Sequence, residues 1–174
     1  MTIRWACAGA IALFACGGGC GPEPELVLGS ASEDRTRFVP VDDGADVPLV
    51  PGSQGGFHVW TGLRVRSASG ILYLEREAHR MSDGERILRA STTVLELPGE
   101  AMDEWWEHPH GDANALPSFM CPPPIGLAVR DEPLIVRAQI LTEDEELLAE
   151  DDLIIVPRCP ADNQADFCAE ICSG

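Results

Sequence analysis

Two histidines on either side of a proline are the residues whose types and spacing could best do chemistry in this sequence. His108 and His110 lie two positions apart, and Asp112 follows shortly after. In an extended backbone, side chains two positions apart point to the same side, and imidazole groups bind zinc or copper. Two imidazoles do not complete a site. We therefore predict a solvated loop and no cofactor, with a metal site on His108, His110 and Asp112 as the alternative.

Acidic residues are concentrated in two other parts of the chain. One stretch covers 42–46, and the other covers 143–146 and 150–152. Calcium binds carboxylate oxygens, but neither stretch has the Asp-x-Asp-x-Asp-Gly spacing of a calcium loop. We therefore predict a turn at 42–46 and an acidic hairpin tip at 142–146, where charge also opposes unwanted strand pairing.

The sequence lacks the common motifs of nucleophilic and phosphate chemistry. It contains no Gly-x-Ser-x-Gly, no His-Glu-x-x-His and no Ser-x-x-Lys, since all twelve basic residues are arginine. His58 and Trp60 fall on the outward face of a predicted strand. Packing beneath a loop is the favoured interpretation there, and a ligand-facing role is the alternative. The sequence thus favours a protein that is not an enzyme.

Four cysteines of the seven fall in the predicted folded part of the chain, namely Cys121, Cys159, Cys168 and Cys172. They are enough for two disulfides in an oxidising compartment, and three pairings are possible. Cys168 and Cys172 would share one face of a helix. A zinc site is disfavoured because no Cys-x-x-Cys pair occurs.

Period-two alternation of apolar and polar residues is the main secondary-structure signal. It is clearest at 57–66, where Phe57, Val59, Thr61, Leu63 and Val65 share one face. Further strands are predicted at 25–29, 37–41, 71–78, 86–97, 125–130, 134–141 and 147–156. A short helix is predicted at 100–107 and irregular chain at 114–124.

Many short strands without a long amphipathic helix predict an all-β fold. Antiparallel strands at this spacing favour an immunoglobulin-like β-sandwich, and a jelly-roll or small barrel is the alternative. We assign the sandwich to 26–158, followed by a cysteine-containing C-terminal tail at 159–174 that packs back on it.

The first fifteen residues have the form of an export signal. Arg4 is followed by an apolar run that is well short of the roughly 20 residues needed to cross a bilayer. The run ends in Leu13-Phe14-Ala15-Cys16. A glycine-rich stretch and then a Pro-Glu repeat lead from there to residue 25, which predicts a flexible tether at 16–25 that becomes stiffer towards its end.

Residues 13–16 resemble the lipobox of bacterial prolipoproteins. The resemblance implies that the Cys16 thiol is joined to diacylglycerol, that a peptidase cuts before Cys16, and that its new amine is acylated. Cys20 is the alternative lipid site. The architecture as a whole resembles that of uncharacterised bacterial envelope lipoproteins with a β-sandwich domain. An ordinary cleavage after Ala10 or Ala12, releasing a soluble secreted protein, is the alternative.

The charge of the protein limits its partners. The whole chain has a formal net charge of −17, and removal of 1–15 takes away one arginine and no acid. Nucleic acid is excluded because phosphate contacts need a basic surface. We expect attachment to the membrane through the lipid, and an envelope protein or glycan as partner. Gly17 in place of the aspartate associated with inner-membrane retention favours the outer membrane.

Overall fold

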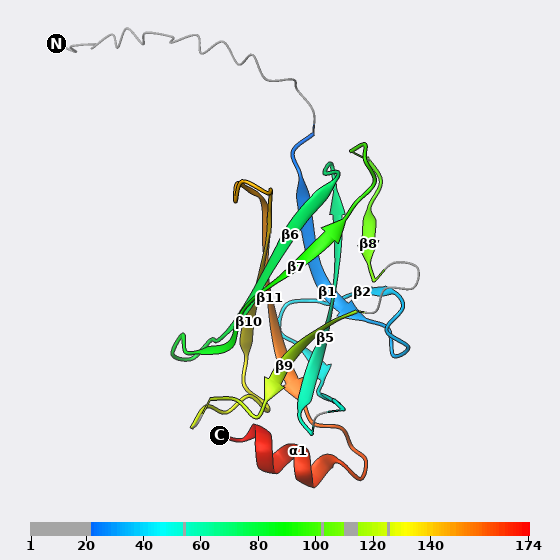
Figure 1. The fold of residues 1–174 in the computed structure, drawn as a ribbon. Coiled ribbons are helices and arrows are strands. Elements are labelled where there is room, and N and C mark those ends of the chain that lie inside the picture. The colour runs from blue at the N-terminus through cyan, green and yellow to red at the C-terminus, as the bar shows by residue number, and fades with distance from the viewer. Residues whose placement is uncertain (1–21, 54, 102, 110–114, 125) are drawn as a thin grey trace, which may run out of the picture.

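The chain folds into a two-layer β-sandwich closed at one end by a short helix (Figure 1). The computed structural model describes residues 22–53, 55–101, 103–109, 115–124 and 126–174. The predicted all-β sandwich is confirmed. The signal sequence, Cys16 and Cys20 lie outside the described residues, as do His110 and Asp112.

Sheet A is built around β5 (Phe57–Arg66), whose bounds were predicted correctly. One edge of β5 pairs with β1 (Glu25–Ala31), which pairs in turn with β2 (Phe38–Pro40). The other edge of β5 is shared by three short strands, β4 (Val50–Pro51), β8 (Trp106–His108) and β9 (Leu116–Cys121).

Sheet B has the order β3-β11-β10-β6-β7. Its strands are β3 (Ala45–Pro48), β6 (Ile71–Arg80), β7 (Arg86–Glu96), β10 (Leu134–Leu141) and β11 (Leu147–Arg158). All pairs in this sheet are antiparallel except β3 with β11. The predicted hairpin between the last two strands is present, and its turn is closed by Thr142 N–H donating to the Glu146 carbonyl at 2.9 Å.

The core lies between the two sheets and follows the predicted alternation. Phe57, Leu63, Leu74 and Ile140 are fully buried. Burying apolar surface of this kind contributes roughly 25 cal/mol per Å², so the inward positions of β5, β6 and β10 supply much of the stability.

One charged side chain also enters the core. Arg76 of β6 is 4% exposed, and its Nη1 donates to the Ser118 hydroxyl of β9 at 3.0 Å. Ser118 in turn lies 2.8 Å from the Thr61 hydroxyl of β5. Burial lowers the pKa of Arg76 to about 10. A polar link therefore joins the two sheets across the apolar core.

Two glycines lie directly opposite one another in sheet A, Gly29 on β1 and Gly62 on β5. A Cβ atom at Gly29 would lie 2.5 Å from the Phe38 ring, and one at Gly62 would lie 2.3 Å from the Ser30 carbonyl oxygen. The missing side chains leave room for the Phe38 ring, which packs over the pair and is 9% exposed. This explains glycine in the middle of two strands, where it normally weakens a sheet.

The C-terminal tail contains the helix α1 (Ala165–Cys172), which packs on the end of the sandwich away from the start of β1 (Figure 1). The Phe167 ring lies 6.0 Å from the Phe57 ring. The backbone carbonyl oxygen of Cys172 accepts hydrogen bonds from the amides of Val129 and Arg130. The expectation that the tail packs back on the sandwich is therefore confirmed.

Three local predictions were wrong, and the turn predicted at 42–46 is shorter than expected because β3 begins at Ala45. The helix expected at 100–107 is absent from the residues described there, and Trp106–His108 pairs with β5 instead, so strand pairing outweighs local helix propensity. Part of the irregular stretch at 114–124 is the strand β9. The strand expected at 125–130 is a turn and loop at 126–130, because two of its amides bond to the end of α1 rather than to a strand.

Within the described residues, no helix is long and apolar enough to cross a membrane.

Candidate functional site

A cavity of about 430 Å³ opens on sheet A beside Trp60, and we call it the Trp60 cavity. One wall is apolar and consists of Pro48, Leu49, Val50, Pro51 and Pro160. These residues come from the β3–β4 segment and from the chain that follows β11. A volume of this size falls in the range of small-molecule sites, which are mostly apolar with a few polar groups.

The charged part of the lining belongs to the loop between β1 and β2. Glu33 and Arg35 both line the cavity. The Arg35 guanidinium lies over the Trp60 ring, 4.5 Å from its centroid, in a cation–π contact. In the described part of the chain, no carboxylate, including that of Glu33, lies within ion-pair distance of Arg35. The cavity therefore presents one cation and one anion that do not neutralise each other.

Hydrogen bonds hold the loop that carries these two charges. Ser32 N–H donates to the Arg37 carbonyl at 2.9 Å, and Arg35 N–H donates to the Ser32 carbonyl at 2.7 Å. Arg35 has a positive φ of 64°, a conformation that is uncommon outside glycine. Hydrogen bonds from Ser32 and Thr36 lower the pKa of Asp34, so this carboxylate stays ionised and keeps the loop closed.

His58 lies next to Trp60 on the same face of β5. Their ring centroids are 6.0 Å apart. Gly52 covers the imidazole, since a Cβ there would lie 2.1 Å from His58 Nε2. Burial, with a smaller contribution from the charge of Arg35, lowers the pKa of His58. His58 is thus packed beneath a loop, whereas Trp60 borders the cavity.

A second group of side chains, which we call the Trp105 cluster, lies further along the same face of β5. Trp105 has the guanidinium carbons of Arg64 and Arg66 at 4.5 and 4.7 Å from its ring centroid. Arg66 also donates two hydrogen bonds to the Glu25 carboxylate, at 2.6 and 2.7 Å. Because Glu25 is the first residue of β1, this cluster lies at the start of the first strand of the sandwich.

Of the predicted metal ligands His108, His110 and Asp112, His108 lies within the described residues. His108 pairs with Leu63 in the β5–β8 ladder, so its side chain points to the core, and it is 8% exposed. Its ring lies 6.0 Å from that of Trp106. His110 and Asp112 lie outside the described residues, so the proposed ligand set remains a prediction.

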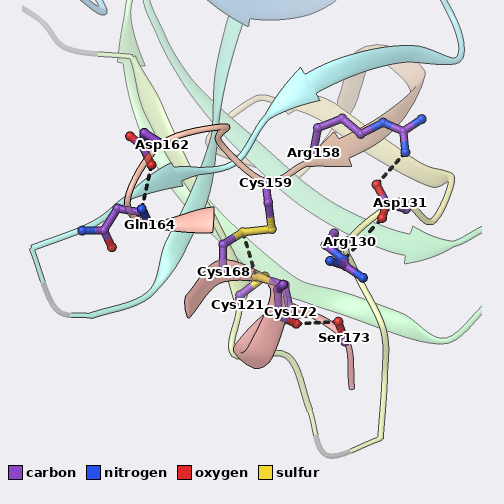
Figure 2. The surroundings of a disulfide bond; sticks show 11 residues. Cys121, Arg130, Asp131, Arg158, Cys159, Asp162, Gln164, Cys168, Cys172 and Ser173 are labelled. Carbon is purple, nitrogen blue, oxygen red and sulfur yellow. Dashed lines mark hydrogen bonds and ion pairs between the residues drawn. A yellow bond between two sulfur atoms is a disulfide. The ribbon is translucent and has the colours of Figure 1, made fainter. Parts of the chain in front are cut away.

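The four cysteines form two disulfides, Cys121–Cys172 and Cys159–Cys168 (Figure 2). The first joins β9 to α1 and the second joins the end of β11 to α1. Sulfur atoms of Cys168 and Cys172 are 3.8 Å apart on one face of the helix. In the part of the chain that the structure describes, the sulfurs of Cys159, Cys168 and Cys172 lie within 4.8 Å of one another, close enough to hold a metal ion. Both pairs are oxidised, so we assign this group a structural role.

Several carboxylates of the acidic stretches hold the fold together. Asp43 accepts a hydrogen bond from the Ile154 amide at 2.9 Å, and Asp151 accepts one from the Leu28 amide at 2.7 Å. Arg137 donates two hydrogen bonds to Asp152, at 2.7 and 2.6 Å. These carboxylates therefore join strands to one another or to the turn before β3.

Sequence reasoning found Trp60 but missed Glu33 and Arg35. The alternation in β5 placed Trp60, Arg64 and Arg66 on one outward face. By contrast, the position of Arg35 depends on how the β1–β2 loop folds over β5, and no local pattern signals that contact.

No protein-family model matches this chain, and no curated protein matches its sequence.

Proposed function

We propose that the protein is a lipid-anchored component of the bacterial cell envelope whose β-sandwich is a non-enzymatic binding module. The observation that carries the proposal is the outer face of β5. There the Trp60 cavity and the Trp105 cluster present aromatic rings and arginines on a protein whose net charge is −17. Aromatic and arginine side chains are enriched where proteins bind partners.

The lipid anchor explains how so acidic a protein stays at a membrane. Anionic headgroups repel a negative surface, whereas two or three acyl chains hold a protein stably at about 0.8 kcal/mol for each buried methylene. An extended chain spans at most about 3.6 Å per residue, so the predicted tether from Cys16 to Glu25 would keep the domain within roughly 30 Å of the bilayer.

The partner that suits this face is an envelope protein or glycan. Trp105 offers a ring that can stack on apolar surface, and Arg64 has no ion-pair partner among the residues that the structure describes. The outer membrane is our proposed location, with a soluble secreted protein as the alternative.

Metabolic labelling with radioactive palmitate tests the anchor. We expect label in the wild type, loss of label in Cys16→Ala, and unchanged label in Cys20→Ala, which is the matched control. Label lost only in Cys20→Ala would move the anchor to the alternative cysteine. If the wild-type protein is unlabelled and is recovered in the medium, the lipid anchor is wrong and the protein is secreted in soluble form.

Cosedimentation with purified cell-wall glycan or isolated outer membrane tests the binding face. We expect Trp105→Ala in the soluble domain to reduce sedimentation at least fivefold, and Ile71→Ala, an exposed position on sheet B, to leave it unchanged. Equal sedimentation of the two variants would argue against this face.

A further inference from the structure

The charges of Glu33 and Arg35 are the starting point for identifying a ligand. They line the same cavity, they do not pair with each other, and both side chains belong to exposed residues. A ligand with a single charge would pair with one of these two side chains and leave the other without a partner of opposite charge. A ligand that carries an ammonium and a carboxylate matches both.

The rest of the cavity describes the body of that ligand. Three prolines, Leu49 and Val50 form the apolar wall of the same cavity. Such a wall gains free energy by removing apolar ligand surface from water, and it offers few hydrogen-bonding side chains to a sugar or another polyhydroxyl compound. The ligand body is therefore apolar and compact.

We propose that the Trp60 cavity binds an apolar amino-acid zwitterion, either a free amino acid or a short peptide with free termini. The guanidinium of Arg35 binds the carboxylate, the carboxylate of Glu33 binds the ammonium, and the side chain rests on the wall of Pro48, Pro51 and Pro160.

The geometry of Arg35 suits this role. Its guanidinium stacks on Trp60 at 4.5 Å, and stacking on the face of the guanidinium leaves its N–H groups free to donate in plane to a carboxylate. The hydrogen-bonded loop holds Arg35 in place before the ligand arrives, which reduces the entropy lost on binding.

This inference rests on the binding module of our proposed function and adds a ligand for one part of its binding face, the Trp60 cavity. It does not depend on the lipid anchor. Palmitate labelling and sedimentation with glycan therefore succeed or fail independently of it. If zwitterions do not bind but the Trp105 cluster still binds an envelope component, only the present inference is overturned.

Isothermal titration of the purified protein with a matched ligand series is the first test. We expect binding of phenylalanine, leucine and the dipeptide Leu-Phe. N-acetylphenylalanine lacks the ammonium, phenylalanine amide lacks the carboxylate, and glycine lacks the apolar body. Each should bind at least tenfold more weakly than phenylalanine. The first two leave one charged side chain of the cavity without its hydrogen-bond partner, and glycine buries no apolar side chain. A preference for the dipeptide over both amino acids would identify a peptide as the ligand.

Variants in the cavity assign each charge. Arg35→Gln should weaken phenylalanine binding at least tenfold, whereas Arg37→Gln, in the same loop but outside the cavity, should change it less than twofold. Glu33→Gln should abolish the preference for phenylalanine over N-acetylphenylalanine, and Glu107→Gln is the control. Unfolding curves show whether each variant is folded. The ligand series uses the wild-type protein, so it tests the proposal even if a variant fails to fold.

Two outcomes would overturn the proposal. One is that phenylalanine, leucine and the dipeptide all fail to bind with a dissociation constant of about 10 mM or below. The other is equal binding of phenylalanine, its amide and its N-acetyl form, which would show that neither charge is recognised.

Discussion

At the scale of single residues, Arg76 is the charged side chain that the described residues bury most deeply. Its hydrogen bond to Ser118 leaves Nε buried without an acceptor. A buried charge that lacks full compensation destabilises a fold, and apolar replacements of similar shape are often neutral or stabilising. The polar link between the sheets therefore fixes how they pack against each other, but it adds little to the free energy of unfolding.

This argument predicts an asymmetry between the two partners. Arg76→Met should change the free energy of unfolding by less than about 1 kcal/mol or increase it, because it removes the buried charge. Ser118→Ala should reduce it by about 1–3 kcal/mol, because it leaves the guanidinium without its acceptor. Urea unfolding with the disulfides intact measures both.

Thr61→Val is the control for this pair, since it removes the other hydroxyl beside Ser118 and leaves the acceptor of Arg76 in place. A larger loss of stability in Arg76→Met than in Ser118→Ala would contradict the prediction.

His58 makes stability depend on pH in a defined direction. Burial lowers the pKa of His58 below 6.5 in the folded protein. As pH falls through 6.5, the unfolded chain therefore binds more protons than the folded protein does. The free energy of unfolding should therefore fall between pH 7 and pH 5. In His58→Gln this decline should be shallower.

Thermal unfolding at several pH values above 5 measures the effect, since the lowered pKa of carboxyl groups such as Asp152 places their contribution at lower pH. An identical slope in the wild type and His58→Gln would show that His58 is not the group responsible.

At the scale of secondary-structure elements, the fold depends on the close approach of β1 and β5. Gly62→Ala would place a methyl group 2.3 Å from the Ser30 carbonyl oxygen, and backbone cannot move aside as a flexible side chain can. We expect a loss of about 1–3 kcal/mol in the free energy of unfolding, as is typical of overpacking.

Gly99→Ala is the matched control for this substitution, because no atom lies within 4 Å of its Cβ position. It should stay within about 0.5 kcal/mol of the wild type, like other surface changes. Equal stabilities of the two variants in chemical denaturation would mean that β1 and β5 can separate at little cost.

At the scale of the whole molecule, the two disulfides attach α1 to the sandwich. Cys121–Cys172 closes a loop with a sequence separation of 51, and Cys159–Cys168 one of 9. Loop-closure entropy predicts that loss of the first lowers the free energy of unfolding by about 4 kcal/mol and loss of the second by about 2.5 kcal/mol.

Removing both cysteines of one pair at a time tests this order, because a single substitution would leave a free thiol near the other bond. We expect Cys121→Ala with Cys172→Ala to be less stable in urea than Cys159→Ala with Cys168→Ala. The reverse order would indicate that packing of the helix matters more than chain entropy.

The sequence by itself determined the features that depend on neighbouring residues. Period-two alternation was enough to place β5 and β10 within their correct bounds and to assign the inward face of β5, because side chains in a strand alternate between faces. Four cysteines in a domain that we expect to be exported were enough to predict two disulfides.

Only the tertiary structure decided which distant residues meet. Cys121 pairs with Cys172 rather than with a nearer cysteine, Trp106–His108 extends sheet A rather than forming a helix, and Arg35 lies over Trp60. Each outcome depends on contacts between segments far apart in the chain, and these contribute more free energy than local propensities. The candidate binding site is made by such contacts, whereas the strand that supports it was readable from its own residues.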